Sequence, residues 1–403
     1  MSDTDTIVAP ATAPQGSLSV IRISGPDSYL VCDKIFSCGG KPPSLRPSHT
    51  VVHGKAKSAD GKVVDEALLL IMRAPKSYTG ENVAEIQCHG GPVVTRRLLG
   101  ACLDAGCRMA EPGEFTRRAF LNGRMDLLQA EAVQDLVRAE TDRAALAALD
   151  QLEGSLSRTV NQIHERLVTA LAGAESVLDF PDDEMPPIPW NSIQKEVRSA
   201  EKEIQALLQG WQEGRILREG IRVVLLGAPN VGKSSLFNRL LDKNRAIVSK
   251  TPGTTRDSLE ESLAIRGYHI RLTDTAGIRE SDCEIEQEGV RRSREHEYCA
   301  DLVVHVIDAT NIKRDSLTGW PGRSGRGNEI WVLNKCDLLD VPTRESIGRL
   351  MSEPRKDGRD QVVAEATKGR CRRIFTSAIT GEGLDELRDA LLETSLDRTS
   401  STW

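Results

Sequence analysis

Hydrophobic and polar positions follow three different patterns along the chain, and each pattern predicts a different kind of structure. Up to about residue 118, apolar side chains alternate with polar ones or form short runs, as in Ser19–Ile23 and Ala67–Met72. Both segments are typical of strands. Glycine and proline pairs that favour turns interrupt this part, namely Gly25-Pro26, Gly39-Gly40, Pro42-Pro43, Gly90-Gly91-Pro92 and Pro112-Gly113. We therefore expect mixed strands and turns here.

A helical period begins at about Asp126. Apolar residues then recur every three or four positions, which predicts one stripe of a long helix, at Leu149, Leu152, Leu156, Val160, Ile163, Leu167, Leu171 and Ala174. The proline-rich stretch 181–189 ends it, because proline removes backbone donors. A second stripe follows at Ile193, Val197, Ala200, Ile204, Leu207, Leu208 and Trp211. Two such apolar faces must pack on each other or on a partner.

A third pattern starts at Ile221, where short apolar segments alternate with helical ones. Ile221–Leu226, Leu302–Ile307 and Ile330–Leu333 are typical of buried strands, and their alternation with helices predicts a doubly wound, mainly parallel α/β sheet. We expect a multidomain α/β and α+β protein with an N-terminal α+β domain. The predicted boundaries are 1–118 for that domain, 119–219 for a helical domain, 220–395 for the α/β domain and 396–403 for a tail.

Composition indicates where the protein is expected to act but says little about its function. The chain has 403 residues and a net charge of -6, so its overall charge does not favour nucleic acid. Without an apolar leader or a long apolar run, we expect a cytoplasmic protein that does not enter membranes. Nine scattered cysteines lack paired metal-ligand spacing, so we expect reduced thiols and no zinc site. Two basic runs could form a local surface for nucleic acid, although such runs are more often solvated helix faces: Arg117, Arg118 and Arg124, or Arg291, Arg292 and Arg294.

Residues 227–234 match the phosphate-binding loop G-x-x-x-x-G-K-[ST]. Its glycines let successive backbone N–H groups face phosphate oxygens. Lys233 would neutralise the β- and γ-phosphates, and the Ser234 hydroxyl would bind Mg²⁺. An apolar strand precedes the loop and a helical run follows it, which is the context that this motif needs.

Three further signals follow in the order expected of a GTPase. Asp274-Thr275-Ala276-Gly277 suits a water-mediated Mg²⁺ contact and a γ-phosphate sensor. Asn334-Lys335-Cys336-Asp337 follows a buried strand, and the Asp337 carboxylate can accept from two N–H donors that guanine has and adenine lacks. The backbone N–H groups of Ser377-Ala378 would hold the guanine carbonyl. Together these motifs predict GTP rather than ATP as the substrate.

The segment between these motifs predicts a switch. Thr255 is placed to bind Mg²⁺ only when GTP is present. The residue after Asp274–Gly277 is Ile278, which cannot orient the attacking water as glutamine does in many GTPases. Arg256 and Arg279 are nearby arginine candidates, and a cation beside the phosphates could supply the missing charge, with Asn230 as a neutral oxygen ligand. Glu284, Glu286 and Glu288 are equal candidates for orienting water.

Beyond the GTPase motifs, the chain resembles the MnmE (TrmE) family of tRNA-modification GTPases from Thr6 to about Leu391. The resemblance rests on segments that a general GTPase would not carry: DTIVAPATAP, VIRISGP, SYTGENVAEIQCHGGP, EPGEFTRRAFLNGRMDLLQAEAV and DFPDDE. It implies a K⁺ ion that joins two GTPase domains, so that hydrolysis depends on dimerisation. It also implies that Glu286 is the catalytic glutamate.

Motifs and resemblance together give a full set of expected site residues. The catalytic residues are Glu286, Lys233 and Thr255. Mg²⁺ would be held by Ser234 and Thr255, and K⁺ by Asn230, Ser249, Thr251 and Thr254. GTP would be bound by Asn230, Val231, Gly232, Lys233, Ser234, Ser235, Ser249, Lys250, Thr251, Pro252, Gly253, Thr254, Thr255, Asp274, Thr275, Ala276, Gly277, Asn334, Lys335, Asp337, Ser377, Ala378 and Ile379.

For the N-terminal part, the resemblance implies a domain that dimerises and binds formyl-tetrahydrofolate through Arg22, Glu81 and Arg124. Family members often have lysine where this chain has Arg124, and an arginine fork is not equivalent to a point charge. The family works with an FAD-dependent MnmG-type partner, in a heterotetramer that uses NADH. Together they install an aminomethyl or carboxymethylaminomethyl group at carbon 5 of the wobble uridine of certain tRNAs.

The C-terminus departs from the family pattern, in which further helices end in Cys-x-Gly-Lys. This sequence ends at Trp403, so we expect an incomplete helical domain with an exposed or repacked apolar face. The first hypothesis is an active tRNA-modification GTPase. The alternatives are a GTP-binding switch module that has lost the modification role, and, least favoured, a folate enzyme with an accessory GTPase domain, because the folate residues supply no evident acid or nucleophile.

Overall fold

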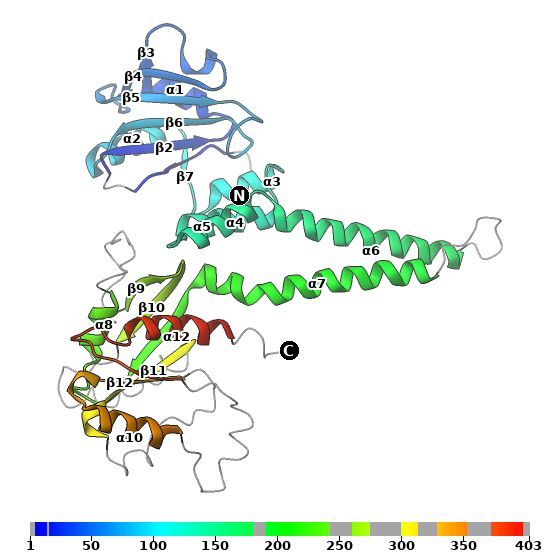
Figure 1. The fold of residues 1–403 in the computed structure, drawn as a ribbon. Coiled ribbons are helices and arrows are strands. Elements are labelled where there is room, and N and C mark those ends of the chain that lie inside the picture. Colours follow the sequence, from blue (N-terminus) through cyan, green and yellow to red (C-terminus); the bar gives the residue numbers. More distant parts are fainter. Residues whose placement is uncertain are drawn as a thin grey trace, which may run out of the picture. The chain divides into compact units, whose positions relative to one another are not determined.

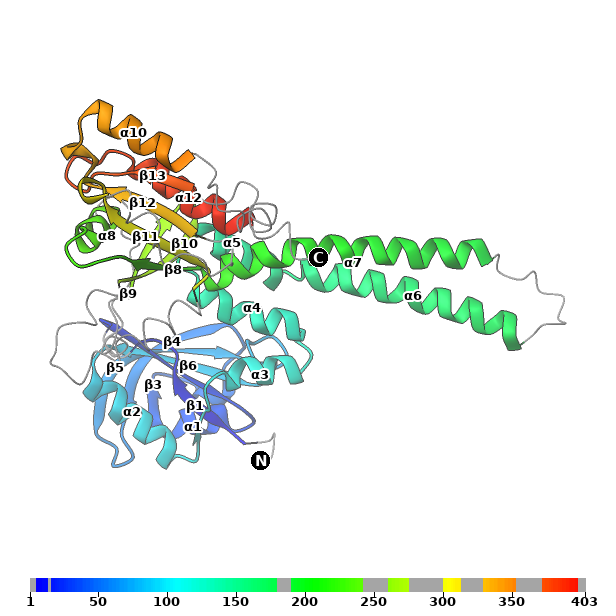
Figure 2. The same ribbon diagram turned by 90° about the horizontal axis from the view of Figure 1, so that it is seen from below.

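The computed structural model describes residues 5–13, 16–179, 190–241, 260–274, 300–312, 329–352 and 372–397. The chain divides into two compact units. One unit combines Met1–Gln134 with Asp150–Thr159, and the other combines Asp135–Leu149 with Val160–Trp403. Figures 1 and 2 show both units in two views, with colours that follow the sequence.

The first unit is built on a seven-stranded sheet with the order β3-β4-β5-β6-β2-β1-β7. All neighbours are antiparallel except β1 and β7. The strands are β1 (Ile7–Pro10), β2 (Leu18–Ser24), β3 (Phe36–Cys38), β4 (Thr50–Lys57), β5 (Val63–Met72), β6 (Val83–His89) and β7 (Arg108–Met109). The strands predicted at Ser19–Ile23 and Ala67–Met72 are thus confirmed as parts of β2 and β5.

Helices α1 (Ser28–Ile35) and α2 (Pro92–Asp104) cover one face of this sheet. Buried residues of both helices, such as Cys32 and Leu98, form one core with Ile21, Ile23 and Ile86 of the strands. Neither helix was predicted from the sequence, where residues 90–92 were predicted to form a turn. In the structure Pro92 occupies the first turn of α2, where its missing N–H costs nothing and its fixed φ suits the helix.

Five helices follow: α3 (Glu114–Leu121), α4 (Leu127–Arg138), α5 (Asp142–Leu152), α6 (Ser155–Asp179) and α7 (Trp190–Glu219). The prediction of one continuous helix through Leu149 and Ala174 is wrong, because the chain breaks at Gly154. That glycine has φ +82°, in the left-handed region, and the carbonyl of Leu152 accepts a hydrogen bond from the Gln129 side chain. The apolar stripe continues across the break in phase, so its spacing alone does not reveal it.

Helices α6 and α7 run side by side in both views (Figures 1 and 2), and Arg166 of α6 pairs with Glu203 of α7. Several apolar side chains of the pair are exposed, among them Val160, Leu167, Leu171, Ile204, Leu208 and Trp211. In the described part of the chain, no helix is both long enough and apolar enough to cross a bilayer.

The second unit contains a six-stranded sheet with the order β13-β12-β11-β8-β10-β9. Its neighbours are parallel except β9 and β10. The strands are β8 (Ile221–Leu226), β9 (Glu260–Ile265), β10 (Tyr268–Asp274), β11 (Leu302–Asp308), β12 (Glu329–Asn334) and β13 (Arg372–Phe375). The three strands predicted in this part are confirmed as β8, β11 and β12.

Both faces of this sheet are covered. Leu236 of α8 (Lys233–Leu241) and Leu387 of α12 (Leu384–Asp397) share a core with alternate residues of β8, β11 and β12. On the other face, Ile347 of α10 (Val341–Ser352) packs with Leu333 and Ala309. Helices on both faces of a mainly parallel sheet are the doubly wound arrangement that the alternation predicted, and the multidomain α/β and α+β fold class is confirmed.

Candidate functional site

The phosphate-binding motif forms a turn between β8 and α8, at the carboxyl edge of the parallel strands. Gly227 passes so close to β11 that a Cβ there would lie 2.3 Å from the Val306 carbonyl oxygen. Gly232 has φ +91°, and its Cβ would lie 2.3 Å from Asn334 Nδ2. Ser234 and Ser235 are exposed on the first turn of α8, where backbone N–H groups lack helical partners. This turn therefore has the backbone geometry that binds phosphate.

Lys233 is buried in this turn, with 7% of its surface exposed. Its Nζ donates to the carbonyl oxygens of Gly227 and Ala228, both at 2.9 Å. The ammonium group is thus held over the curve of the loop by neutral acceptors, which an anionic phosphate oxygen can replace with a stronger, charge-assisted bond. Val231, the remaining predicted loop residue before Gly232, is buried in the core.

The segment Asn334–Asp337 lies at the end of β12 and is hydrogen-bonded to the phosphate-binding loop. Asn334 Nδ2 donates to the Val231 carbonyl at 2.9 Å, and Lys335 Nζ donates to the Asn230 carbonyl at 2.9 Å. Lys335 adopts φ +65° and Asn230 φ +63°, both unusual for residues other than glycine. Asp337 is exposed at this edge. The structure therefore brings together two motifs that are about a hundred positions apart.

The third predicted segment, Ser377–Ile379, follows β13 and joins the same cluster. Ala378 N donates to Asn334 Oδ1 at 3.3 Å, and Cys336 N donates to the Thr376 carbonyl at 3.1 Å. Ile379 is 79% exposed. Burial, with Glu382 nearby, raises the pKa of Cys336 to about 11, so this thiol is protonated at neutral pH.

One residue of this edge was not singled out from the sequence. Asp308 ends β11 beside Asn334 of β12, and its Oδ2 lies 2.6 Å from Lys335 Nζ. A carboxylate at the carboxyl end of a buried strand was visible in the sequence, but its partner was not.

The remaining predicted residues lie partly or wholly outside the described residues. Asp274 is the last residue of β10 and pairs in register with Leu225 of β8. The others lie outside the described residues: Ser249, Lys250, Thr251, Pro252, Gly253, Thr254, Thr255, Thr275, Ala276, Gly277 and Glu286. The alternatives Arg256, Arg279, Glu284, Glu288, Arg291, Arg292 and Arg294 also fall there.

In the first unit, the three predicted folate residues are all connected to the turn around Tyr78. The Arg22 guanidinium lies over the Tyr78 ring, 4.9 Å from its centroid, and pairs with Glu85 at 2.7 Å. Arg124 Nε donates to the Tyr78 carbonyl at 2.9 Å. Glu81, three residues further along, accepts from the Ser24 hydroxyl at 2.7 Å.

Glu81 is held in turn by a partly buried charge cluster that we call the Arg118 cluster, formed by Asp5, Glu81, Arg108, Glu114 and Arg118. Arg118 is 5% exposed and contacts Asp5 at 2.6 Å, Glu81 at 3.2 Å and Glu114 at 3.2 Å. Burial alone would raise the pKa of Glu114, but hydrogen bonds from Arg108, the Glu111 backbone and Arg118 lower that pKa to about 2.

The same cluster lowers the pKa of Asp5 to about 2, mainly through its hydrogen bond with Arg108. The hypothesis that Arg118 belongs to a basic surface for tRNA is therefore wrong for this residue, since its guanidinium is buried among carboxylates. Arg117 and Arg124 are exposed.

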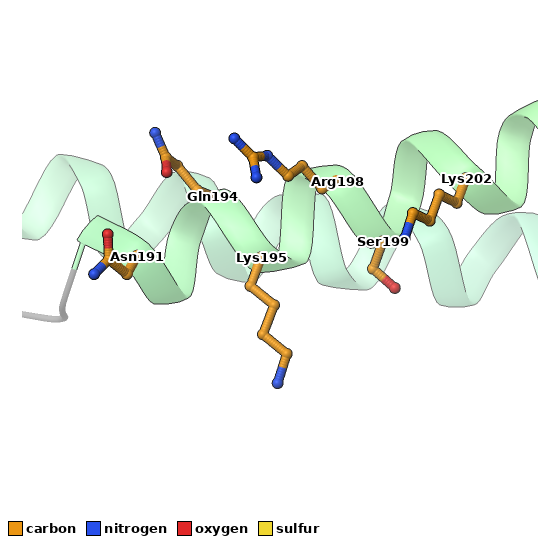
Figure 3. Close-up of a pocket in the computed structure, with 6 residues that line it drawn as sticks. All are labelled: Asn191, Gln194, Lys195, Arg198, Ser199 and Lys202. Atoms are coloured by element: carbon orange, nitrogen blue, oxygen red, sulfur yellow. The ribbon is translucent and has the colours of Figure 1, made fainter.

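A shallow hollow lies along α7, lined by Asn191, Gln194, Lys195, Arg198, Ser199 and Lys202. Figure 3 shows that these side chains all come from one helix and that Lys195 points away from Gln194 and Arg198. They do not converge on one point, so the hollow lacks the geometry of a ligand site. Within the described ranges, no three His, Cys, Asp or Glu side chains are grouped to hold a metal ion.

Comparisons with known proteins agree with this arrangement. The family described as "GTP-binding protein TrmE N-terminus" matches residues 6–124, and "MnmE helical domain" matches residues 127–402. The tRNA modification GTPase MnmE of Symbiobacterium thermophilum is 48% identical over 375 residues, covering 90% of this chain and 82% of the relative. That of Geobacter sulfurreducens is 43% identical over 393 residues, covering 97% of this chain and 81% of the relative.

Among solved structures, the G domain of the T. maritima FeoB iron transporter aligns with 43% of this chain and 98% of its own, at 25% identity and a TM-score of 0.27. The two family matches cover nearly the whole chain, and the resemblance first seen in the sequence motifs is confirmed. The chain belongs to the MnmE (TrmE) family, whose curated relatives are named tRNA modification GTPases.

Proposed function

We propose that this chain is a potassium-dependent GTPase that hydrolyses GTP to GDP and phosphate and, with an FAD-dependent MnmG-type partner, modifies carbon 5 of the wobble uridine of certain tRNAs. The observation that supports it best is the hydrogen-bonded junction between the phosphate-binding loop and the segment Asn334–Asp337. Base-reading and phosphate-binding groups are thereby fixed at one edge of the sheet.

In this proposal the phosphate-binding loop holds the triphosphate through three groups. The N–H groups at the start of α8 face the β-phosphate, and Lys233 exchanges its carbonyl acceptors for phosphate oxygens. Ser234 and Thr255 would hold Mg²⁺, which neutralises charge on the β- and γ-phosphates. Ser234 is exposed, and its hydroxyl oxygen is the kind of ligand that a hard cation such as Mg²⁺ prefers. Water attacks the γ-phosphorus, and the bond to the β–γ bridging oxygen breaks to leave GDP.

Guanine specificity is assigned to Asp337, whose carboxylate would accept from the two N–H donors of guanine. The backbone N–H groups of Ser377 and Ala378 would bind the guanine carbonyl. This assignment is supported by the 3.3 Å contact from Ala378 N to Asn334 Oδ1, which links the two base-binding segments. Asp337→Asn should exchange the preference from guanine to xanthine nucleotides, since an amide offers a donor where xanthine has a carbonyl.

Potassium dependence is assigned to Asn230, with Ser249, Thr251 and Thr254, and water orientation to Glu286. These residues would hold a K⁺ ion, which would supply positive charge to the phosphates and would make hydrolysis depend on dimerisation of the GTPase domain. Asn230 fits this role because its exposed side chain provides a neutral oxygen and its backbone carbonyl is already fixed by Lys335.

The test compares steady-state GTP hydrolysis in KCl and NaCl at equal ionic strength. Stimulation by potassium that is lost in Asn230→Ala, with turnover lost in Glu286→Ala, supports the proposal. Asn238→Ala, which truncates an exposed asparagine on α8 just past the loop, is the matched control and should keep potassium stimulation. Equal, slow hydrolysis in both salts would exclude the potassium-bridged mechanism.

Formyl-tetrahydrofolate is assigned to the turn around Tyr78, with Arg22, Glu81 and Arg124 as its ligands. The Arg118 cluster supports this by fixing Glu81, which is 18% exposed, in one position. Calorimetric titration with the folate should show binding by the wild type and weak or no binding by Glu81→Gln. Glu66→Gln, which removes an exposed charge on β5, should bind normally. Normal binding by both variants would remove Glu81 from the site.

The proposed domains are 1–118, 119–219 and 220–395, with a tail at 396–403. Homodimerisation is assigned to the N-terminal domain, residues 1–118. On the sheet face opposite the core, Leu18, Val51 and Leu68 are 54%, 59% and 39% exposed. Apolar residues exposed on a sheet face are typical of an interface. Leu68→Lys should shift the sedimentation coefficient towards the monomer, whereas an unchanged dimer would place the interface elsewhere.

The tRNA reaction is tested in cells that lack their own family member. Expression of this chain should restore the carbon-5 modification of the wobble uridine, read by mass spectrometry of digested tRNA. The expressed chain should be found in the cytoplasm, read by cell fractionation. Restoration that requires the FAD-dependent partner supports the complete proposal. Active GTP hydrolysis without restored modification would leave only the GTPase part standing.

A further inference from the structure

Asp308 occupies a buried position next to the proposed guanine-binding segment. Strands β11 and β12 are parallel, and Asp308 pairs in register with Asn334. Parallel strands end at the same edge of a sheet, so the carboxylate of Asp308 reaches the residue that follows Asn334. Only 9% of Asp308 is exposed, and a carboxylate at such a site needs partners for its charge.

Both oxygens of this carboxylate are engaged. Oδ1 accepts from the backbone N of Thr310 at 3.0 Å and from its hydroxyl at 2.6 Å. Oδ2 accepts from Lys335 Nζ at 2.6 Å. Burial alone would raise the pKa of Asp308, but the bonds from Lys335 and Thr310 lower it overall, so the group is ionised at neutral pH.

Lys335 is therefore held at two points. Its Nζ contacts the Asp308 carboxylate and also donates to the Asn230 carbonyl of the phosphate-binding loop at 2.9 Å. A free lysine side chain samples many rotamers, and selecting one of them costs conformational entropy. Its ammonium group is thereby fixed at the edge of the sheet, and Lys335 directly precedes the short helix Cys336–Leu338 that contains Asp337.

We propose that Asp308 is a positioning residue that holds Lys335 against the phosphate-binding loop and so arranges the guanine-binding segment before a nucleotide arrives. The inference rests on the proposed assignment of Asn334–Asp337 to guanine. Asp308 contacts neither the phosphates nor the attacking water in this proposal. Its loss therefore weakens the binding of GTP and GDP alike and leaves the chemical step intact.

The test uses the full chain and fluorescent mant-GDP and mant-GTP. Asp308→Asn keeps the shape of the side chain and removes its charge, and we expect both nucleotides to dissociate about tenfold faster, the loss typical of one charged hydrogen bond. KM for GTP should rise with little change in kcat. Asp308→Glu, which restores the charge, should recover part of the affinity. Asp301→Asn makes the same substitution directly before the first residue of β11, at the other end of the strand. This control should keep the wild-type dissociation rates for both nucleotides.

A double-mutant cycle separates positioning of Lys335 from a general structural role. In a Lys335→Met background, Asp308→Asn should change the dissociation rate by less than about twofold, because the group that it positions is gone. Full additivity of the two substitutions, or a fall in kcat with KM unchanged, would overturn the proposal.

The wild type is measured first, with mant-GDP and mant-ADP. A clear preference for the guanine nucleotide establishes the basis of the inference. If Asp308→Asn then leaves the nucleotide dissociation rates unchanged, the inference alone is refuted. No preference in the wild type would refute the assignment of the guanine-binding segment and, with it, the role of Asp308.

Discussion

Glu114 offers the most direct test of the buried charges in the first unit. Its side chain is 1% exposed and accepts from Arg108 at 2.7 Å and from Arg118 at 3.2 Å. Lowering its pKa from 4.5 to about 2 corresponds to about 3 kcal/mol of stability. Glu114→Gln removes this charge and leaves two arginines without it, so we expect the free energy of unfolding to fall by about 3 kcal/mol near neutral pH.

The dependence on pH has a definite sign. Because the pKa of Glu114 is lower in the folded state, its stabilisation is present above 4.5 and is lost as the pH falls towards 2. The difference in the free energy of unfolding between the wild type and Glu114→Gln should thus shrink to less than half of its neutral-pH value at about pH 3.

Pulse proteolysis in urea measures this difference on the full chain. Thermolysin is used near neutral pH and pepsin near pH 3. Unfolding of the first unit is followed through the fragments that arise from residues 16–134. Glu111→Gln is the control, since Glu111 is 47% exposed and 3.5 Å from Arg117. It should cost less than about 0.5 kcal/mol. A loss below about 1 kcal/mol for Glu114→Gln, or a difference that grows in acid, would refute the assigned stabilisation.

Three further predictions concern the second unit. Gly232→Ala places a Cβ 2.3 Å from Asn334 Nδ2 at φ +91° and should reduce mant-GDP affinity at least about tenfold, measured by fluorescence titration; unchanged affinity would contradict the close approach. Gly383→Ala places a Cβ 1.9 Å from the Phe375 carbonyl oxygen at φ +72° and should cost about 3 kcal/mol by urea unfolding, while a loss below about 1 kcal/mol would contradict the crowding. Arg266→Ala breaks an exposed ion pair with α12 and should change the thermal midpoint by less than about 2 °C; a larger fall would give this pair a structural role.

Three of the six strands of the second unit, β8, β11 and β12, were predictable because each is a short apolar run. Ile221–Leu226 is observed with the predicted bounds. Helix α1 was not, because it is only eight residues long and more than half of its side chains are buried, so no clear amphipathic period shows. The break at Gly154 depends on a hydrogen bond from Gln129, a residue one helix earlier, and no local window contains both.

The candidate site shows the same division. The loop 227–234 carries its chemistry in consecutive residues, so its position could be predicted from the motif alone. Arg118 looked like a surface charge because its three carboxylate partners lie at positions 5, 81 and 114. Only the paired strands and the helix after them bring those charges together, and the register that does so is not a property of any one segment.

The hydrogen bonds that join the phosphate-binding loop to Asn334 and Lys335 link residues 103 and 105 positions apart. During synthesis at about 5 to 20 residues per second, the loop waits about 5 to 20 seconds for its partners to emerge from the ribosome. A nucleotide can therefore be retained only by a chain whose sheet has closed as far as β12. Nucleotide binding then reports folding of the sheet at least as far as β12, and each bound molecule further stabilises the folded sheet by mass action.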